Sequence, residues 1–155
     1  MRVVGLILLL LFFENASPSV LDYLDCGYTM GIEEVTFGYC TYSPCTVNIN
    51  KPQEIFVKLS SPESVPPFQT IRTTANLLQM NIPWELKITP ENPCTSWNCP
   101  LSKPITDQSL SATVDFSNIA LLRPGRLLIR GYVSEPVALR DPLFCVEIAV
   151  SLTRQ

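Results

Sequence analysis

The sequence of 155 residues contains no histidine, and both charged residues and glycines are few. Without histidine, Ser-His-Asp and Cys-His catalysis, histidine metal sites and imidazole pH switches are excluded. Charged residues make up 16% of the chain, below the roughly 25% that is usual in soluble domains. The net charge is −3 and the 11 basic residues are scattered, which argues against a nucleic-acid partner.

The sequence also lacks the motifs of an enzyme. It has no G-x-S-x-G nucleophile elbow and no glycine-rich phosphate loop. Glu33 and Glu34 are adjacent, so on a strand they would face opposite sides and could not cooperate as a carboxylate pair. Serine and threonine nucleophiles would have no histidine base. We therefore expect a protein that is not an enzyme and that needs neither a metal nor a cofactor.

Hydrophobic residues make up 46% of the chain, and the first apolar run lies near its start. This run, residues 3–13, is followed by small residues and is too short to span a bilayer, which is typical of a secretory signal peptide. We predict that residues 1–19 are cleaved off, with cleavage after Ala16 as the other option and an uncleaved membrane anchor as the alternative. Residues 20–155 then form one secreted domain.

Six cysteines remain in that domain: Cys26, Cys40, Cys45, Cys94, Cys99 and Cys145. An even number of cysteines in an exported chain predicts three disulfides, but spacing alone does not select their pairing. Cys40 with Cys45, and Cys94 with Cys99, are close enough for a turn to bring each pair within disulfide reach. The competing interpretation is a zinc site, which the absence of histidine disfavours.

The rest of the chain shows the alternation of apolar and polar residues that is typical of half-buried strands. Ile55, Val57 and Leu59, for example, would share one face. Prolines fall mostly between such segments, and no helical period persists. The pattern predicts an all-β sandwich or barrel of antiparallel strands. The expected strands are residues 31–37, 46–49, 54–59, 71–80, 82–88, 109–116, 127–133 and 144–152.

The cysteine motifs, taken in order, are specific in combination. They are Asp25–Gly27, Cys40-x4-Cys45, Cys94-x4-Cys99-Pro-Leu101 and Leu143–Ala149. Together they resemble the ML family of lipid-recognition domains and, in the first half, its small soluble Niemann–Pick type C sterol-transfer proteins. The resemblance covers nearly all of the domain. It implies an immunoglobulin-like sandwich of two antiparallel sheets with a lipid cavity between them, and the disulfides Cys26–Cys145, Cys40–Cys45 and Cys94–Cys99.

The second half adds features of another branch of that family. Residues 116–125 look like the loop that gates the pocket mouth in the endotoxin co-receptor branch. Residues 81–90 take the place of a proline-rich segment that carries an aromatic residue in the sterol-transfer branch. Trp84 and Leu86 are the substitutes here. The resemblance therefore directs attention to these two segments as borders of a lipid pocket.

The candidate site residues follow from the strand faces and from this resemblance. Arg123 and Arg126 are candidates for the pocket rim, where they would meet an anionic headgroup; the alternative is that they are solvated surface charges. An ordinary filled core is the alternative for the apolar set, because periodicity does not separate it from a pocket wall. The candidate lipid-binding residues are Val57, Leu78, Met80, Ile82, Trp84, Leu86, Phe116, Ile119, Leu121, Leu122, Ile129, Val146 and Ile148.

These observations lead to one functional prediction and two rivals. We expect a secreted lipid-binding and transfer protein that holds one apolar lipid, such as a sterol, a fatty acyl chain or a glycolipid tail, and touches membranes transiently. The endolysosomal lumen is the second candidate location. The first rival is a lipid-sensing co-receptor subunit for a receptor ectodomain in innate immunity. The second is a purely adhesive sandwich with a filled core.

Overall fold

The computed structural model describes residues 21–27, 29–60, 71–97, 99, 108–133 and 141–155. The predicted signal peptide lies outside these residues. None of the helices in the described part is long and apolar enough to cross a membrane.

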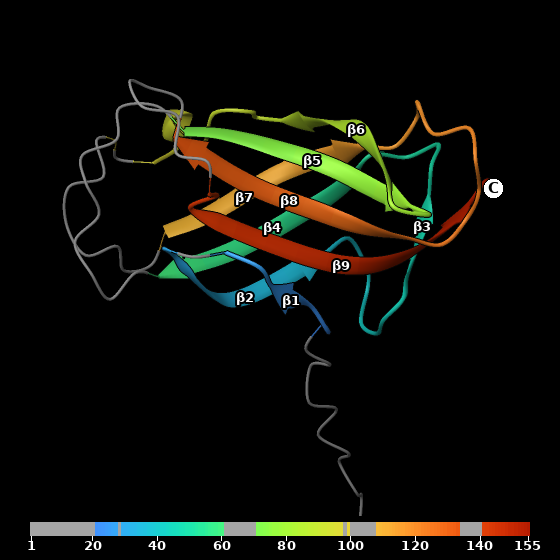
Figure 1. Cartoon of the computed structure of the whole chain (residues 1–155), viewed down its shortest axis with the longest axis horizontal. Coiled ribbons are helices and arrows are strands. Elements are labelled where there is room, and N and C mark those ends of the chain that lie inside the picture. Colours follow the sequence, from blue (N-terminus) through green and yellow to red (C-terminus); the bar gives the residue numbers. More distant parts are fainter. Residues whose placement is uncertain (1–20, 28, 61–70, 98, 100–107, 134–140) are drawn as a thin grey trace, which may run out of the picture.

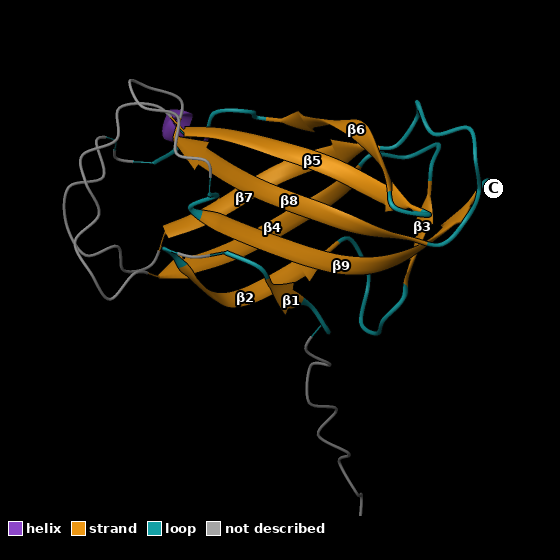
Figure 2. Ribbon diagram, viewed as in Figure 1, coloured by secondary structure: helices purple, strands orange, loops and turns teal. Residues whose placement is uncertain are grey.

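The described chain is built from nine strands and one short 3-10 turn (Figures 1 and 2). Alternating burial along each long strand shows why they form: in β4 the side chains of Ile55, Val57 and Leu59 are buried while their neighbours are not. The elements are β1 Leu24–Asp25, β2 Gly31–Phe37, β3 Cys45–Asn48, β4 Gln53–Ser60, β5 Ile71–Gln79, β6 Ile82–Thr89, η1 Pro93–Thr95, β7 Gln108–Asp115, β8 Gly125–Val133 and β9 Phe144–Thr153.

The strands form two layers, which cross in Figure 1 with β8 and β9 in front of β4 and β7. One layer has the order β1-β9-β8-β5, and the other has β7-β4-β2. The predicted all-β fold is confirmed, with one correction to its antiparallel pairing. β3 runs parallel to β9. After β2 the chain turns at the Cys40–Cys45 disulfide and crosses to the edge of the other layer, where β3 pairs with β9.

Strand β6 connects the two layers. Its first half, Ile82–Leu86, pairs with β5, and its second half, from Lys87 to Thr89, pairs with β7. The path of hydrogen-bonded strands therefore continues from one layer to the other through a single strand. The β5–β6 turn that precedes it is tight, and both of its central residues, Met80 and Asn81, have positive φ.

Three disulfides fasten this sandwich, and all six cysteines take part. Their pairing is the one that the resemblance implies. Cys26–Cys145 closes a loop of 119 residues, which in the chain-entropy model stabilises the fold by about 4–5 kcal/mol, more than either short bridge. Disulfides form and persist in oxidising compartments, so the three bridges indicate a protein of the secretory pathway.

Candidate functional site

Seven of the 13 candidate lipid-binding residues are buried, among them Val57, Ile129, Val146 and Ile148, which have no exposed surface. Ile129 pairs with Ala75 of β5 and Val146 of β9, so these side chains share the inner face of one sheet. Val57 faces them from the other layer. Burial is common to the wall of a closed cavity and to a packed core, and it does not by itself distinguish the two. The other buried candidates are Leu86, Phe116 and Ile119.

The side chains of β6 that point between the two layers become exposed toward the start of the strand. Directly opposed residues of an antiparallel pair point to the same face, and Trp84 lies opposite Leu77, which is fully buried. Leu86 is likewise buried, but Trp84 is 40% exposed and Ile82 is 51% exposed. This half of β6 pairs with β5 and not with β7, so it lies where β6 has separated from the second layer, and its inward-facing side chains remain partly exposed.

The β7–β8 loop lies against this open part of β6. Its Asn118 Nδ2 donates a hydrogen bond to the Glu85 carbonyl oxygen at 2.9 Å. Gln79 Nε2 donates to the carbonyl oxygens of Leu121 and Arg123 at 3.0 and 2.8 Å. These three bonds hold the loop to the β5–β6 hairpin, at the right-hand end of the molecule in Figure 1.

Large apolar side chains are exposed on both sides of this junction. They form a surface that we call the mouth patch, which consists of Met80, Ile82, Trp84, Leu121 and Leu122. All five were candidate lipid-binding residues. Met80 was expected at the end of a strand, but it belongs to the turn, because the hairpin needs positive φ there.

Polar groups fix both ends of the loop. The backbone N–H and hydroxyl of Ser117 hold the pKa of Asp115 below its ordinary value, and the N–H lies 2.8 Å from Asp115 Oδ1.

Gln79, which bonds to the other end of the loop, is buried, and its Oε1 has no hydrogen-bond partner within the described structure. A buried acceptor without a partner costs free energy, so this oxygen marks a polar position at the inner end of the mouth patch.

Two candidates lie on the other side of the sheet. Leu78 pairs with Arg126, and its neighbours Leu77 and Gln79 are the buried ones, so Leu78 and Arg126 both face outward. Arg126 forms an ion pair with Glu147 at 3.0 Å on that outer surface. The expectations that Leu78 lines the space between the sheets and that Arg126 lies at its rim are therefore wrong.

Arg123 does reach the mouth patch. Its Nη1 lies 3.0 Å from the Met80 sulfur, and the side chain is exposed. It is therefore the candidate rim arginine that adjoins the apolar surface. The difference from Arg126 arises because Arg123 precedes β8, whereas Arg126 is already in the strand and follows its alternation.

Sequence reasoning missed the two amide residues that hold the loop, Gln79 and Asn118. A signal for Gln79 was present: it follows Thr73, Ala75 and Leu77 at every second position and is polar at an inward-facing place. The bond from Asn118 joins residues 33 apart in sequence, and no local pattern indicates it.

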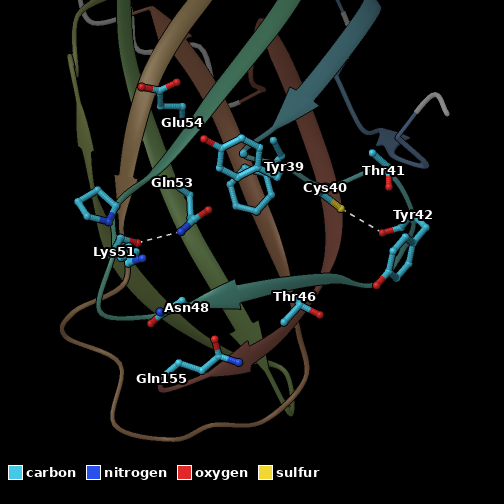
Figure 3. Close-up of a pocket in the computed structure, with 13 residues that line it drawn as sticks. Tyr39, Cys40, Thr41, Tyr42, Thr46, Asn48, Lys51, Gln53, Glu54 and Gln155 are labelled. Atoms are coloured by element: carbon cyan, nitrogen blue, oxygen red, sulfur yellow. Dashed lines mark hydrogen bonds between the residues drawn. The ribbon is translucent and has the colours of Figure 1, made fainter. Parts of the chain in front are cut away.

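A pocket of about 570 Å³ lies elsewhere, between the β2–β3 turn, β3 and the start of β4 (Figure 3). It contains none of the candidate lipid-binding residues. Its lining includes Tyr39, Tyr42, Asn48 and Gln53. The candidate lipid site and this pocket are thus separate features.

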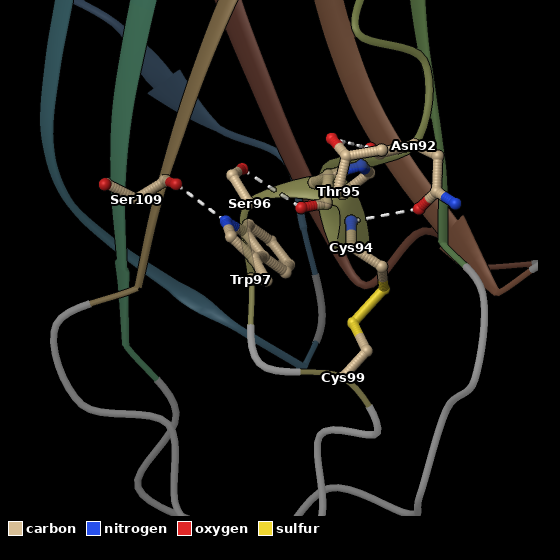
Figure 4. Close-up of a disulfide and its surroundings, with 8 residues drawn as sticks. Asn92, Cys94, Thr95, Ser96, Trp97, Cys99 and Ser109 are labelled. Carbon is tan, nitrogen blue, oxygen red and sulfur yellow. Dashed lines mark hydrogen bonds between the residues drawn. A yellow bond between two sulfur atoms is a disulfide. The ribbon is translucent and has the colours of Figure 1, made fainter.

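The second tryptophan belongs to the closed part of the sandwich (Figure 4). Trp97 lies inside the loop that the Cys94–Cys99 disulfide closes, is only 6% exposed and donates from Nε1 to the Ser109 carbonyl oxygen at 2.6 Å. Its ring centroid is 6.4 Å from that of Phe144. Trp97 therefore packs into the core and is not available to a ligand at the surface.

The chain resembles a known protein in structure and not in sequence. No family model matches the sequence, and no curated protein matches it. Among solved structures, a Niemann-Pick type C2 protein from Japanese carpenter ant superposes on 85% of this chain and 99% of its own, with a TM-score of 0.68 and 13% sequence identity. The chain therefore has the fold of a Niemann-Pick type C2 protein, the ML-type sandwich.

Proposed function

We propose that this protein binds one apolar lipid between its two sheets and exchanges it through the mouth patch, without covalent chemistry. The observation that carries the proposal is the exposure of two inward-facing side chains, Ile82 and Trp84. Such side chains are normally covered by the opposite sheet of a sandwich, and clustered exposed apolar side chains mark interaction sites. A lipid that enters here would cover them.

The energetics favour an apolar guest. Burial of an acyl chain or a sterol stabilises the complex by about 0.8 kcal/mol per methylene group, from which the cost of ordering the ligand is subtracted. The buried side chains of Val57, Ile129 and Ile148 continue inward from the mouth patch and would border the tail. Arg123 beside Met80 would meet an anionic or polar headgroup.

The proposed setting is extracellular, with transient contact to membranes during lipid exchange. Three disulfides support export, and the endolysosomal lumen is the second compartment in which they would persist. A co-receptor role is the alternative function. The exposure of Leu121 and Leu122 on one loop favours it, because a receptor ectodomain could dock on them.

The two tryptophans allow a direct test. Purified, delipidated protein is titrated with a brominated fatty acid and with a brominated sterol, each of which quenches only nearby indoles. We expect at least one of them to quench the emission of Trp84 and to leave Trp97 bright. Trp84→Phe then loses the quenching. Leu24→Ser serves as the matched control, because Leu24 is exposed but lies on β1, at the opposite edge of its layer from β5.

Mass spectrometry of lipid extracted from the secreted protein completes the test. Absence of any co-purified lipid, together with no quenching by either brominated lipid, would overturn the proposal in favour of a filled adhesive sandwich. Transfer between vesicles supports the carrier role. Capture of a receptor ectodomain that Leu121→Ser abolishes, without vesicle transfer, supports the co-receptor role instead.

A further inference from the structure

The pocket beside the β2–β3 turn differs in chemistry from the mouth patch. Nine of the 13 residues that line it carry hydroxyl, amide or charged groups, and the other four are Phe37, Gly38, Cys40 and Pro52. No leucine, isoleucine, valine or methionine is among the described residues that line it. Its volume of about 570 Å³ lies within the range of small-molecule sites, roughly 300–1,000 Å³. The apolar part of this lining comes mainly from aromatic rings set among polar groups, which differs from the aliphatic surface of the mouth patch.

Two tyrosines supply the aromatic part of this pocket. Tyr39 is fully exposed and Tyr42 is 71% exposed, so neither ring contributes to the core. Aromatic rings carry negative charge on their faces, and the weakly positive C–H groups of a sugar ring pack against such a face. Tyrosine also offers a large contact area with few rotatable bonds to immobilise.

The turn that carries these tyrosines is held in place before any ligand arrives. The Cys40–Cys45 disulfide joins residues five apart in sequence, with Tyr42 inside the closed loop and Tyr39 immediately before it. The Cys40 amide donates to the Phe37 carbonyl oxygen at 2.9 Å across the turn. A preorganised surface lowers the entropy cost of binding.

Polar groups surround the tyrosines. Figure 3 shows Gln53 and Lys51 on one side, Tyr42 on the other, and Thr46 and Asn48 on β3. Gln53 Nε2 donates to the Lys51 carbonyl oxygen at 3.0 Å, and Asn48 Oδ1 accepts from the backbone N–H of Asn50 at 3.0 Å. Each amide is fixed through one end, which leaves the other end to bind a ligand hydroxyl.

The charges of the side chains around the pocket balance. Lys51 is the basic residue in the lining and Glu54 the acidic one, so neither an anion nor a cation is favoured as a whole. A ligand with apolar ring faces and many hydroxyl groups matches exposed aromatic rings, neutral amides and threonine hydroxyls. We propose that this pocket is a binding site for a short neutral oligosaccharide, separate from the lipid site and independent of it.

The test uses the secreted full domain and four neutral trisaccharides: chitotriose, maltotriose, cellotriose and mannotriose. Saturation-transfer NMR identifies binding, and calorimetry measures it. We expect at least one trisaccharide to bind, with a dissociation constant of roughly millimolar order. Tyr39→Ala and Tyr42→Ala should each weaken binding about tenfold or more, whereas Tyr39→Phe, which keeps the ring, should retain most of the affinity.

Controls separate this site from the lipid site and from misfolding. Both tyrosines are exposed, so the alanine variants should melt like the wild type. Trp84→Ala should bind the trisaccharide normally, whatever it does to lipid uptake. The proposal is overturned if none of the four sugars binds, if binding survives loss of both rings, or if a proline-rich peptide binds the tyrosines and the sugars do not.

Discussion

The two tryptophans of this protein occupy opposite environments. Trp97 is 6% exposed, packs against Phe144 and satisfies its Nε1 within the core. Trp84 points to the same interior space between the layers but is 40% exposed. The difference lies in what covers each ring. Trp97 is held in a loop closed by a disulfide and bonds to a strand of the second layer, whereas Trp84 lies on the half of β6 that pairs only with β5.

The sharpest way to test this comparison is to delete the buried ring. Trp97→Ala should lower the free energy of unfolding by about 3–5 kcal/mol, because it removes a large buried side chain and leaves a cavity. Denaturant unfolding at constant m value measures the change. Trp84→Ala is the matched variant and should cost far less stability. Equal losses in the two variants would contradict the distinction between a closed and an open region.

The next largest effect should come from the residue that holds the loop. Gln79→Leu removes two hydrogen bonds and leaves the carbonyl oxygens of Leu121 and Arg123 without that donor. We expect a loss of about 1–3 kcal/mol in the free energy of unfolding. Amide hydrogen exchange should show faster exchange in residues 116–124, while the strands around Trp97 stay protected. Unchanged exchange in the loop would show that Gln79 does not hold it.

Deleting the exposed ring should affect binding more than folding. Trp84→Ala should change the unfolding free energy by about 1 kcal/mol or less and weaken uptake of a fluorescent fatty acid or sterol about tenfold. Equilibrium titration of the lipid probe measures the affinity. Leu24→Ser should leave uptake unchanged, since Leu24 is outside the mouth patch. If the two variants bind the probe equally well, Trp84 is not at the entrance.

The smallest expected effect concerns pH. Hydrogen bonds from Ser117 lower the pKa of Asp115 in the folded state, so the carboxylate contributes stability above the ordinary carboxyl pKa and loses it as pH falls through the lowered value. Asp115→Asn should therefore be less stable than the wild type near neutral pH, and the difference should vanish in strong acid. Thermal melting at a series of pH values provides the measurement. A difference that persists in strong acid would assign the effect to something other than this titration.

Local pattern was enough to predict most strands. The segment 54–59 was expected from Ile55, Val57 and Leu59, and β4 extends it by one residue at each end. The parallel pairing of β3 with β9 was not predictable, because it depends on where a turn directs the chain between layers. The disulfide pairing came from the family resemblance, since spacing left alternatives open.

The candidate site was predictable only in part. Trp84 and Ile82 were predicted as lipid-binding residues, but their exposure was not. β6 changes its pairing partner after Leu86, and no local sequence pattern indicates that change. Leu78 was misplaced because alternation fixes which residues share a face but not which face is inside. The pocket at Tyr39 and Tyr42 was missed, because exposed tyrosines in a turn give no periodic signal.

The Cys26–Cys145 bridge also has a mechanical consequence. Strands β2 to β8 lie between the two bridged cysteines. A pulling force applied outside the bridge is transmitted through the covalent sulfur–sulfur bond and bypasses these seven strands. Under tension the described part of the chain outside the bridge lengthens by peeling β1 and β9 from their neighbours, while the segment from β2 to β8 is shielded from the direct pull.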